Sequence, residues 1–337
     1  MNTFDFSRLK ALLATKKKIL LTSHANPDGD ALGSSLAMYH FLKLSGHDVN
    51  VIVPNSYPDF LVWMPGQEKI LIYEENKKLC DELFKFSDIL FSLDYNAPSR
   101  LGMAAGSFKK AKGIKVLIDH HIQPETKTYD HIFSTIDISS TSEIVYEFMY
   151  QINSGLINKS MAECIYAGIM TDTGSFSYAC NYERTFGIVA DLYKSGIDGV
   201  KINRLVYATF SENRLRLLGY ALSEKLKVLP EYSTAHISLT RKELKHFNYQ
   251  VGDTEGLVNY ALSIKGIKFA ALFTERKDKI RISLRSVGEF SVNSLANKHF
   301  EGGGHKNAAG GDSFLTLDET LKKFERLLPE YEGQLSK

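Results

Sequence analysis

Three side chains that can bind metal ions occur within seven residues near the N-terminus, in the string His24-Ala-Asn-Pro-Asp28-Gly-Asp30. The string stands between a short apolar run and a long helical pattern. Carboxylates and imidazoles at this spacing are able to hold a divalent ion. A simpler interpretation is that residues 26–29 form a turn and that Asp30 caps a helix beginning at Ala31. This interpretation leaves His24 unexplained.

Further ligand-type residues stand at the ends of other predicted elements. Asp94 and the triplet Asp119-His120-His121 each follow a short apolar run, and Asp172 follows an apolar helical pattern. Each aspartate alone has an ordinary explanation as a helix cap or a turn residue. The repetition of acidic and imidazole groups at several strand ends favours a shared site.

Alternating strands and helices must position these groups. Apolar runs predict strands at 18–22, 49–53, 89–93 and 114–118, and helical spacing predicts helices at 5–15, 31–44, 100–110, 142–153, 161–170 and 184–194. This order predicts an α/β fold with a parallel sheet and helices on both faces. The carboxyl ends of parallel strands meet at one edge, where ligands bind.

The expected ligand set combines carboxylate oxygens with imidazole nitrogens, and its members are His24, Asp28, Asp30, Asp94, His120 and Asp172. Six such groups suffice for two divalent metal ions that share one carboxylate. Magnesium rarely uses imidazole, whereas manganese accepts both kinds of ligand, so we expect Mn²⁺. Paired ions ~3.5 to 4 Å apart activate water for in-line displacement at phosphorus. The set therefore indicates a phosphoesterase.

A second, smaller α/β domain is expected in the C-terminal part. The pattern changes after about residue 195, and a charged helical stretch at 212–228 ends before Pro230. Beyond it the pattern predicts strands at 233–239, 268–274 and 279–285 and helices at 255–264, 292–300 and 317–327. We expect a catalytic domain at 1–195, a helical linker at 196–229 and a substrate-binding domain at 230–330.

The second domain contains two features suited to phosphate. Arg281, Ser283 and Arg285 alternate with apolar residues, so they share one face of a strand. Guanidinium groups suit phosphate recognition, although a solvated strand face is the ordinary alternative. The segment that follows offers consecutive N–H groups that can wrap an anion, in Gly302, Gly303, Gly304 and His305. We expect these residues to bind substrate.

Composition and charge narrow the class of partner. The chain of 337 residues has 41 basic and 39 acidic residues, for a net charge of +2. This balance argues against a general affinity for long duplex nucleic acid. The three cysteines stand far apart and the N-terminus does not resemble a signal peptide, which favours a reducing, cytoplasmic location. No apolar stretch approaches the ~20 residues of a spanning helix, so we expect no membrane.

The sequence resembles the DHH phosphoesterase superfamily, since its signature blocks occur in order as HANPDGDA, the strand-end Asp94, the Asp-His-His triplet and Thr-Asp-Thr-Gly. The C-terminal part resembles the DHH-associated domain, DHHA1. The usual loop there reads G-G-G-G-H, and this chain has Glu301 at the first glycine position. We expect this departure to narrow the range of substrates and to leave His305 and three glycines in place.

The resemblance implies roles for individual residues. One metal ion would be bound by His24, Asp28 and Asp94, and a second by Asp30, Asp94, His120 and Asp172, with Asp94 as the bridge. His121 would face the scissile phosphate, where an imidazole can donate a proton or a hydrogen bond. We assign to Asp119 the orientation of an imidazole.

Length and both signature sets resemble the stand-alone NrnA-type subfamily, which degrades very short RNA to mononucleotides and removes the 3′-phosphate of adenosine 3′,5′-bisphosphate (pAp). The resulting hypothesis is in-line attack by a metal-bridging hydroxide while the second domain holds a terminal phosphate. Alternatives are a phosphodiesterase for pApA or cyclic-di-AMP, a polyphosphate or pyrophosphate hydrolase, and a nucleotide sensor without turnover. Short RNA or a small nucleotide is the expected partner, and a homodimer is left open.

Overall fold

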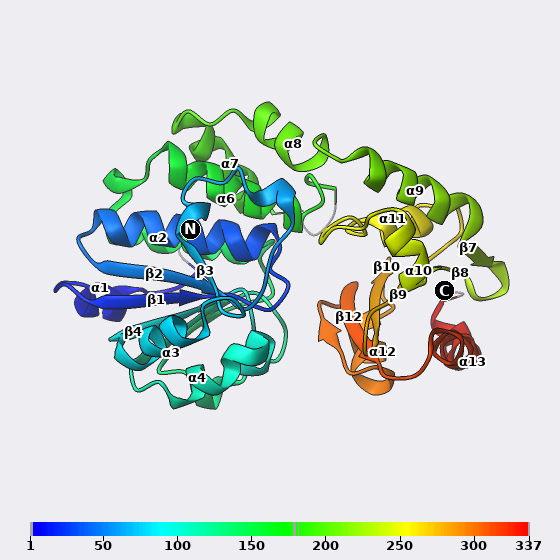
Figure 1. The fold of residues 1–337 in the computed structure, drawn as a ribbon. Helices are drawn as coiled ribbons and strands as arrows, with labels where there is room; N and C mark the ends of the chain where they lie inside the picture. The colour runs from blue at the N-terminus through cyan, green and yellow to red at the C-terminus, as the bar shows by residue number, and fades with distance from the viewer. Residues whose placement is uncertain (1–2, 178–179, 181, 336–337) are drawn as a thin grey trace. The chain divides into compact units, whose positions relative to one another are not determined.

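The structure, a computed structural model, describes residues 3–177, 180 and 182–335. The chain forms two units, Met1–Thr209 and Phe210–Lys337, and each unit has a six-stranded sheet of its own (Figure 1). Within these described residues, no helix is both long enough and apolar enough to cross a bilayer.

All strands of the first sheet are parallel: β1 (Lys18–Thr22), β2 (Asp48–Val53), β3 (Ile70–Ile72), β4 (Ile89–Leu93), β5 (Ile114–Asp119) and β6 (His131–Ser134). Their order is β3-β2-β1-β4-β5-β6. Strands β2 and β3 therefore lie on one side of β1, and the next strands in the chain, β4, β5 and β6, lie on the other side. Ligands of open α/β sheets bind at such a reversal, beyond the carboxyl ends of the strands.

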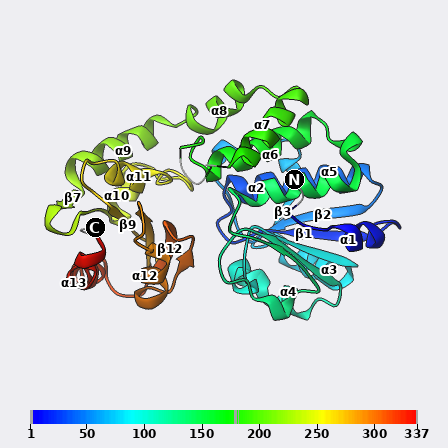
Figure 2. The same cartoon turned by 180° about the vertical axis from the view of Figure 1, so that it is seen from behind.

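The α-helices that the structure describes in this unit are α1 (Ser7–Leu12), α2 (Gly29–Leu44), α3 (Lys77–Phe86), α4 (Ala105–Lys110), α5 (Thr141–Asn153), α6 (Lys159–Asp172), α7 (Glu183–Lys194) and α8 (Gly199–Tyr207). Helices α2, α5 and α6 lie on one face, and α3 and α4 lie on the other (Figures 1 and 2). Successive strand residues alternate between the two cores, since Leu21 packs under α2 and Leu20 packs under α3 and α4.

Glycine allows helices α2, α5 and α6 to approach one another closely. A Cβ atom at Gly33 of α2 would lie 2.5 Å from the Cys164 carbonyl oxygen of α6. One at Gly168 of α6 would lie 2.0 Å from Ser142 Oγ of α5 and 2.9 Å from Asp30 Oδ1 of α2. Any side chain at Gly168 would thus separate the helices at the point where Asp30 projects between them.

The second unit has the strand order β11-β12-β10-β9-β8-β7. The strands are β7 (Leu226–Leu229), β8 (Thr234–Leu239), β9 (Phe269–Glu275), β10 (Ile280–Ser286), β11 (Gly303–Gly304) and β12 (Ala308–Ser313). All neighbours pair antiparallel except β8 and β9. The α-helices among the described residues of this unit are α9 (Glu212–Glu224), α10 (Arg241–His246), α11 (Leu257–Leu262), α12 (Val292–His299) and α13 (Leu317–Leu335).

The predicted fold class is confirmed, including the parallel sheet with helices on both faces and the smaller α/β unit. Several elements were not predicted, among them β3, β6, α3, α10, β11 and β12. The prediction of helix at 226–228 was wrong, because these residues form β7 by pairing with β8. The helix expected at 100–110 begins as a 3₁₀ helix, Pro98–Ala104, in which Gly102 has φ 54°.

Candidate metal centre

The loop after β1 presents His24 and Asp28. His24 Nδ1 lies 3.0 Å from the Ala25 carbonyl oxygen. A proton on Nδ1 fits this contact and leaves Nε2 as the free nitrogen, which lies 3.4 Å from Asp94 Oδ2 and 3.9 Å from Asp28 Oδ2. Asp28 Oδ1 accepts hydrogen bonds from the N–H groups of Asp30 and Ala31, both at 3.1 Å. The helix cap is therefore Asp28 and not Asp30, and α2 begins at Gly29.

Asp94 stands at the end of β4 in an unusual backbone conformation. Its φ of 66° lies in the left-handed region, which costs a non-glycine residue on the order of 1 to 3 kcal/mol. Its N–H donates to the Ile118 carbonyl oxygen at 3.1 Å, which ties the turn to β5. The carboxylate is buried and lies 3.4 Å from Nε2 of both His24 and His120. Asp94 thus stands between two imidazoles from different strand ends.

Asp30, His120 and Asp172 form a second group. His120 Nε2 lies 3.3 Å from Asp172 Oδ2 and 3.8 Å from Asp30 Oδ2. The buried carboxylate of Asp30 accepts hydrogen bonds from two N–H groups of the first turn of α5, those of Thr141 at 2.7 Å and Ser142 at 2.9 Å. These bonds fix its direction while leaving further lone pairs for another ligand.

His121 and Asp119 form a buried pair beside this group. His121 Nδ1 lies 2.7 Å from Asp119 Oδ1 and 3.7 Å from Asp94 Oδ1. Asp119 is fully buried at the last position of β5. The short contact orients the imidazole and favours the tautomer with its proton on Nδ1. In this tautomer Nε2 of His121 carries no proton and presents its lone pair.

The ligand atoms converge into two groups of three, in each of which all donor atoms lie within 4.8 Å of one another: His24 with Asp28 and Asp94, and Asp30 with His120 and Asp172. The structure thus brings together all six side chains of the expected ligand set. Mixed carboxylate and imidazole donors of this kind could hold divalent metal ions.

The electrostatics of the two groups fit a cation. Burial and the charges of Asp94 and Asp172 hold the pKa of Asp30 well above its usual value. Burial is also the main cause that raises the pKa of Asp172, to about 7. Burial opposes protonation of His120, but Asp172 and Asp94 outweigh it and raise its pKa well above the ordinary value. Without a metal ion, protons must neutralise these crowded carboxylates, and a divalent cation would replace the protons.

Arg281, Ser283 and Arg285 lie on one face of β10 and are half-buried, while the alternating apolar residues are buried. Arg281 Nη1 lies 3.3 Å from Asp312 Oδ1 on β12, and Lys279 Nζ lies 2.7 Å from Asp312 Oδ2. The Asp312 carboxylate thus pairs with Arg281 and Lys279, and the sequence pattern does not indicate this pairing.

The glycine segment forms an edge hairpin. Gly303 and Gly304 make up β11 and pair with β12, and the His305 N–H donates to the Ala308 carbonyl oxygen at 2.8 Å. A Cβ at Gly302 would lie 2.1 Å from the Gly310 oxygen, and Gly304 has φ 144°. A Cβ at Gly303 would meet nothing closer than 3.5 Å. The hairpin therefore accounts for Gly302 and Gly304 but not for Gly303.

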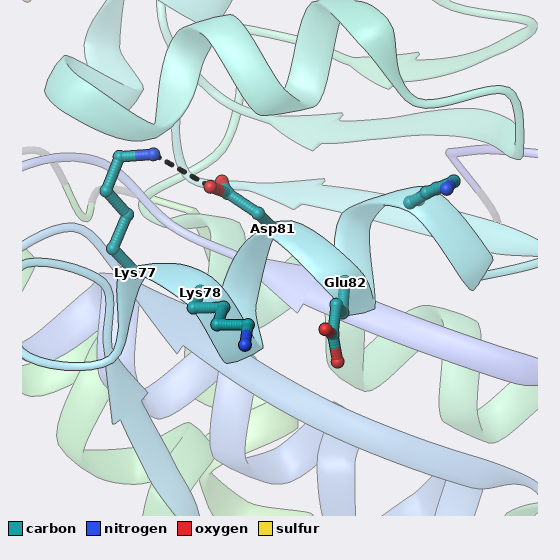
Figure 3. A pocket seen from close by; sticks show the side chains of 5 residues that line it. Lys77, Lys78, Asp81 and Glu82 are labelled. Atoms are coloured by element: carbon teal, nitrogen blue, oxygen red, sulfur yellow. Dashed lines mark hydrogen bonds and ion pairs between the residues drawn. The ribbon is translucent and has the colours of Figure 1, made fainter.

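A shallow hollow lies along the outer side of α3, and its lining side chains all come from that helix (Figure 3). Asp81 there accepts hydrogen bonds from Lys77 and Tyr73, both at 2.7 Å, and from Ser107 at 2.5 Å. These bonds lower the pKa of Asp81 to about 2. The hollow is a solvated helix face with an internally paired carboxylate, and none of the expected ligands line it.

Thr141 and Ser142 are site residues that the sequence analysis missed. Ser140 followed three positions later by Glu143 is a pattern that predicts a helix start, and the Ser140 hydroxyl does accept from the Glu143 N–H. Nothing in the sequence indicates that this helix start reaches Asp30, which stands more than a hundred positions earlier.

Two family models match the chain. The model described as DHH family, N-terminal domain, matches residues 18–169, and the DHHA1 domain model matches residues 233–332. The first match ends within α6, and the second covers β10, the glycine hairpin and most of α13.

Named relatives align over nearly the whole chain. The Bifunctional oligoribonuclease and PAP phosphatase NrnA of Bacillus subtilis is 28% identical over 93% of this chain and 96% of the relative. The Cyclic-di-AMP phosphodiesterase GdpP of the same organism is also 28% identical, over 96% of this chain, which spans about half (49%) of GdpP. A crystal structure of an exopolyphosphatase-related protein from Bacteroides fragilis is 44% identical, with a TM-score of 0.93 and coverage of 98% of this chain and 97% of that one.

Proposed function

Since the chain belongs to the DHH family of phosphoesterases, we propose that this phosphate-ester hydrolase degrades short oligoribonucleotides to mononucleotides and removes the 3′-phosphate of pAp. The observation that carries the proposal is a pair of ligand groups at Asp94, where the strand order of the parallel sheet reverses. One group contains Asp94, and the other places His120 Nε2 3.4 Å from its carboxylate. The relative named as an oligoribonuclease and PAP phosphatase aligns with this chain almost end to end, which supports the substrate class.

We infer that the two groups hold two divalent ions, His24, Asp28 and Asp94 one of them, and Asp30, Asp94, His120 and Asp172 the other. Manganese suits the mixture of carboxylate and imidazole ligands better than magnesium. When bound, such a pair supplies an activated water and stabilises charge on the phosphate oxygens.

His121 is proposed as the residue that faces the scissile phosphate. Asp119 holds its Nδ1 at 2.7 Å. Asp119 thereby orients the ring, and Nε2 is the nitrogen that can face a phosphate or leaving-group oxygen, to which it donates only when both ring nitrogens carry protons. Replacing Asp119 by asparagine should consequently loosen the orientation of His121 without removing any proposed metal ligand.

In the second unit, we propose that Arg281, Ser283, Arg285 and the segment Gly302 to His305 bind a terminal phosphate of the substrate. Guanidinium groups recognise phosphate through paired hydrogen bonds. A clamp for one terminal phosphate suits a short ligand, and the net charge of +2 offers little attraction to a long polyanion. The described structure has its three cysteines buried and unpaired, which fits a reducing compartment, and we propose that the enzyme works in the cytoplasm.

A second candidate is hydrolysis of cyclic-di-AMP or pApA, favoured by the similarity to GdpP. It would use the same metal ligands, so only substrate comparison separates the two. Hydrolysis of polyphosphate is the third candidate, because one similar structure carries the name exopolyphosphatase-related protein.

The test is product analysis with purified protein and added Mn²⁺ on four substrates in parallel: RNA of two to five nucleotides, pAp, cyclic-di-AMP and polyphosphate. We expect mononucleotides and AMP from the first two and little product from the others. Preferential cleavage of cyclic-di-AMP or polyphosphate would move the assignment to the second or third candidate. Absence of turnover on all four, despite bound metal, would favour a nucleotide sensor.

A further inference from the structure

Thr141, the first residue of α5, contacts two proposed metal ligands at once. Its backbone N–H donates to Asp30 Oδ2 at 2.7 Å, and its hydroxyl donates to Asp94 Oδ1 at 3.0 Å. The residue is fully buried. One residue that follows β6 in the chain therefore connects a ligand on α2 with a ligand at the end of β4.

The hydroxyl differs in kind from the other groups around Asp94. His24 and His120 each place Nε2 3.4 Å from the Asp94 carboxylate. An imidazole nitrogen that binds a metal ion presents a lone pair and can no longer donate a hydrogen bond. The Thr141 hydroxyl keeps its proton at neutral pH and lies 3.0 Å from Asp94 Oδ1, so it remains a donor to Asp94 whether or not the ions are bound.

The position of Thr141 is fixed by its surroundings. Ser140 caps α5, with its hydroxyl accepting from the Glu143 N–H, and the N–H groups of Thr141 and Ser142 both bind Asp30. Helix α6 packs against this turn, because a Cβ at Gly168 would overlap Ser142 Oγ at 2.0 Å. The packing of three helices thereby holds the backbone of Thr141 in place, and the contact with Asp94 directs its hydroxyl.

We propose that Thr141 is a positioning residue that sets the spacing of Asp30 and Asp94, and thereby the affinity for the second metal ion and its coupling to the first. The inference rests on the proposed function, since it concerns the same pair of ions. Partners that orient metal ligands typically contribute about 10- to 100-fold in metal affinity. The contribution of Thr141 lies in this range.

The experiment compares Thr141→Val with Thr141→Ser. Valine keeps the shape and the backbone N–H but lacks the hydroxyl, whereas serine keeps the hydroxyl and lacks the methyl group. Mn²⁺ binding to metal-free protein is measured by calorimetry, and the spin coupling of the two ions by electron paramagnetic resonance. Thermal unfolding of the metal-free proteins checks folding. If the valine variant does not fold, Thr141→Ala against Thr141→Ser gives the same comparison.

We expect the wild type and the serine variant to bind two coupled Mn²⁺ ions with affinities that agree within a few-fold. The valine variant should bind the second ion about 10- to 100-fold more weakly and lose the coupled spectrum. Wild-type affinity and coupling in the valine variant would refute the role of Thr141 and leave the proposed function intact. Equal weakening in both variants would refute the role of the hydroxyl, and a wild type that binds no metal pair would refute the proposed function as well.

Discussion

Replacement of Asp94 by asparagine should abolish the activity while keeping the fold. Asparagine has the same shape and is one of the few non-glycine residues that adopt the left-handed region readily, which position 94 requires with its φ of 66°. The side-chain amide oxygen can still accept from the Thr141 hydroxyl, which lies 3.0 Å from Asp94 Oδ1. The main change is the loss of one negative charge between the two ligand groups.

The size of the effect follows from the geometry. The Asp94 carboxylate lies 3.4 Å from Nε2 of both His24 and His120. A metal ion bound by the carboxylate and either nitrogen would lie no farther from the carboxylate than this, and two unit charges 3.4 Å apart interact with about 5 kcal/mol at an effective dielectric constant near 20. That energy corresponds to between three and four orders of magnitude in a binding constant. The amide oxygen offsets part of the loss, so we expect Mn²⁺ affinity to fall at least ~10³-fold.

Calorimetric titration of Mn²⁺ into metal-free protein measures this loss directly, and hydrolysis of pAp and dinucleotide RNA measures its consequence. Asp48→Asn is the matched control, because Asp48 is exposed at the start of β2, at the opposite edge of the sheet. Among the described residues its carboxylate pairs only with Lys43, at 3.4 Å. The control should bind two ions and retain full activity. An Asp94→Asn protein that binds Mn²⁺ within tenfold of wild type and turns over pAp would refute the reasoning.

Three further outcomes are expected. Protons compete with metal at Asp172, whose pKa is raised to about 7, and at His120, whose pKa is raised well above its ordinary value. Mn²⁺ affinity measured between pH 5.5 and 8 should therefore rise with pH throughout this range, because both groups must lose their protons to bind metal. In the metal-free protein the sign reverses: groups that bind protons more tightly in the folded state lose their stabilising effect as pH rises through 7, so the Tm should fall. Mn²⁺ at about 100 times its Kd should add about 2.7 kcal/mol per site to the free energy of unfolding, which raises the Tm by roughly 5 to 10 °C for each site. Failure of a chelator to reverse this rise would contradict the proposed site. Gly303→Ala should raise the KM for pAp with an unchanged Tm, whereas Gly302→Ala should lower the Tm, since its Cβ would meet a carbonyl oxygen at 2.1 Å. A wild-type KM in the Gly303 variant would contradict a ligand contact at Gly303.

The strands that carry the ligands could be predicted because their residues are apolar on both faces. Strands β1 and β4 match the predicted ranges 18–22 and 89–93, and both lie at the centre of the sheet with helices on either side. Edge strands give a weaker signal, since β3 is half-buried throughout and β6 contains one buried residue. Such strands form by pairing with a neighbour, which local composition does not indicate.

The structure of the glycine segment could not be predicted from the local sequence either. Three consecutive glycines indicate a loop when read locally, and the pattern equally permits a strand. Pairing of Gly303 with Gly310 forms β11, and the near approach of Gly302 to the Gly310 oxygen requires the absence of a side chain. The need for glycine at positions 302 and 304 is therefore set by their close approach to β12, which the local sequence does not record.

The ligand types and their placement at strand ends were readable from the chain alone, because aspartate and histidine beside apolar runs are chemically distinctive and parallel strands share one carboxyl edge. The resemblance to the DHH phosphoesterases also implies how these residues divide into two groups. Tertiary structure decided which aspartate caps α2 and which residue connects Asp30 to Asp94. These facts depend on contacts between segments as far as 111 residues apart. A hydrogen bond of that range is set by helix packing and strand order, and neither residue type nor local spacing records it.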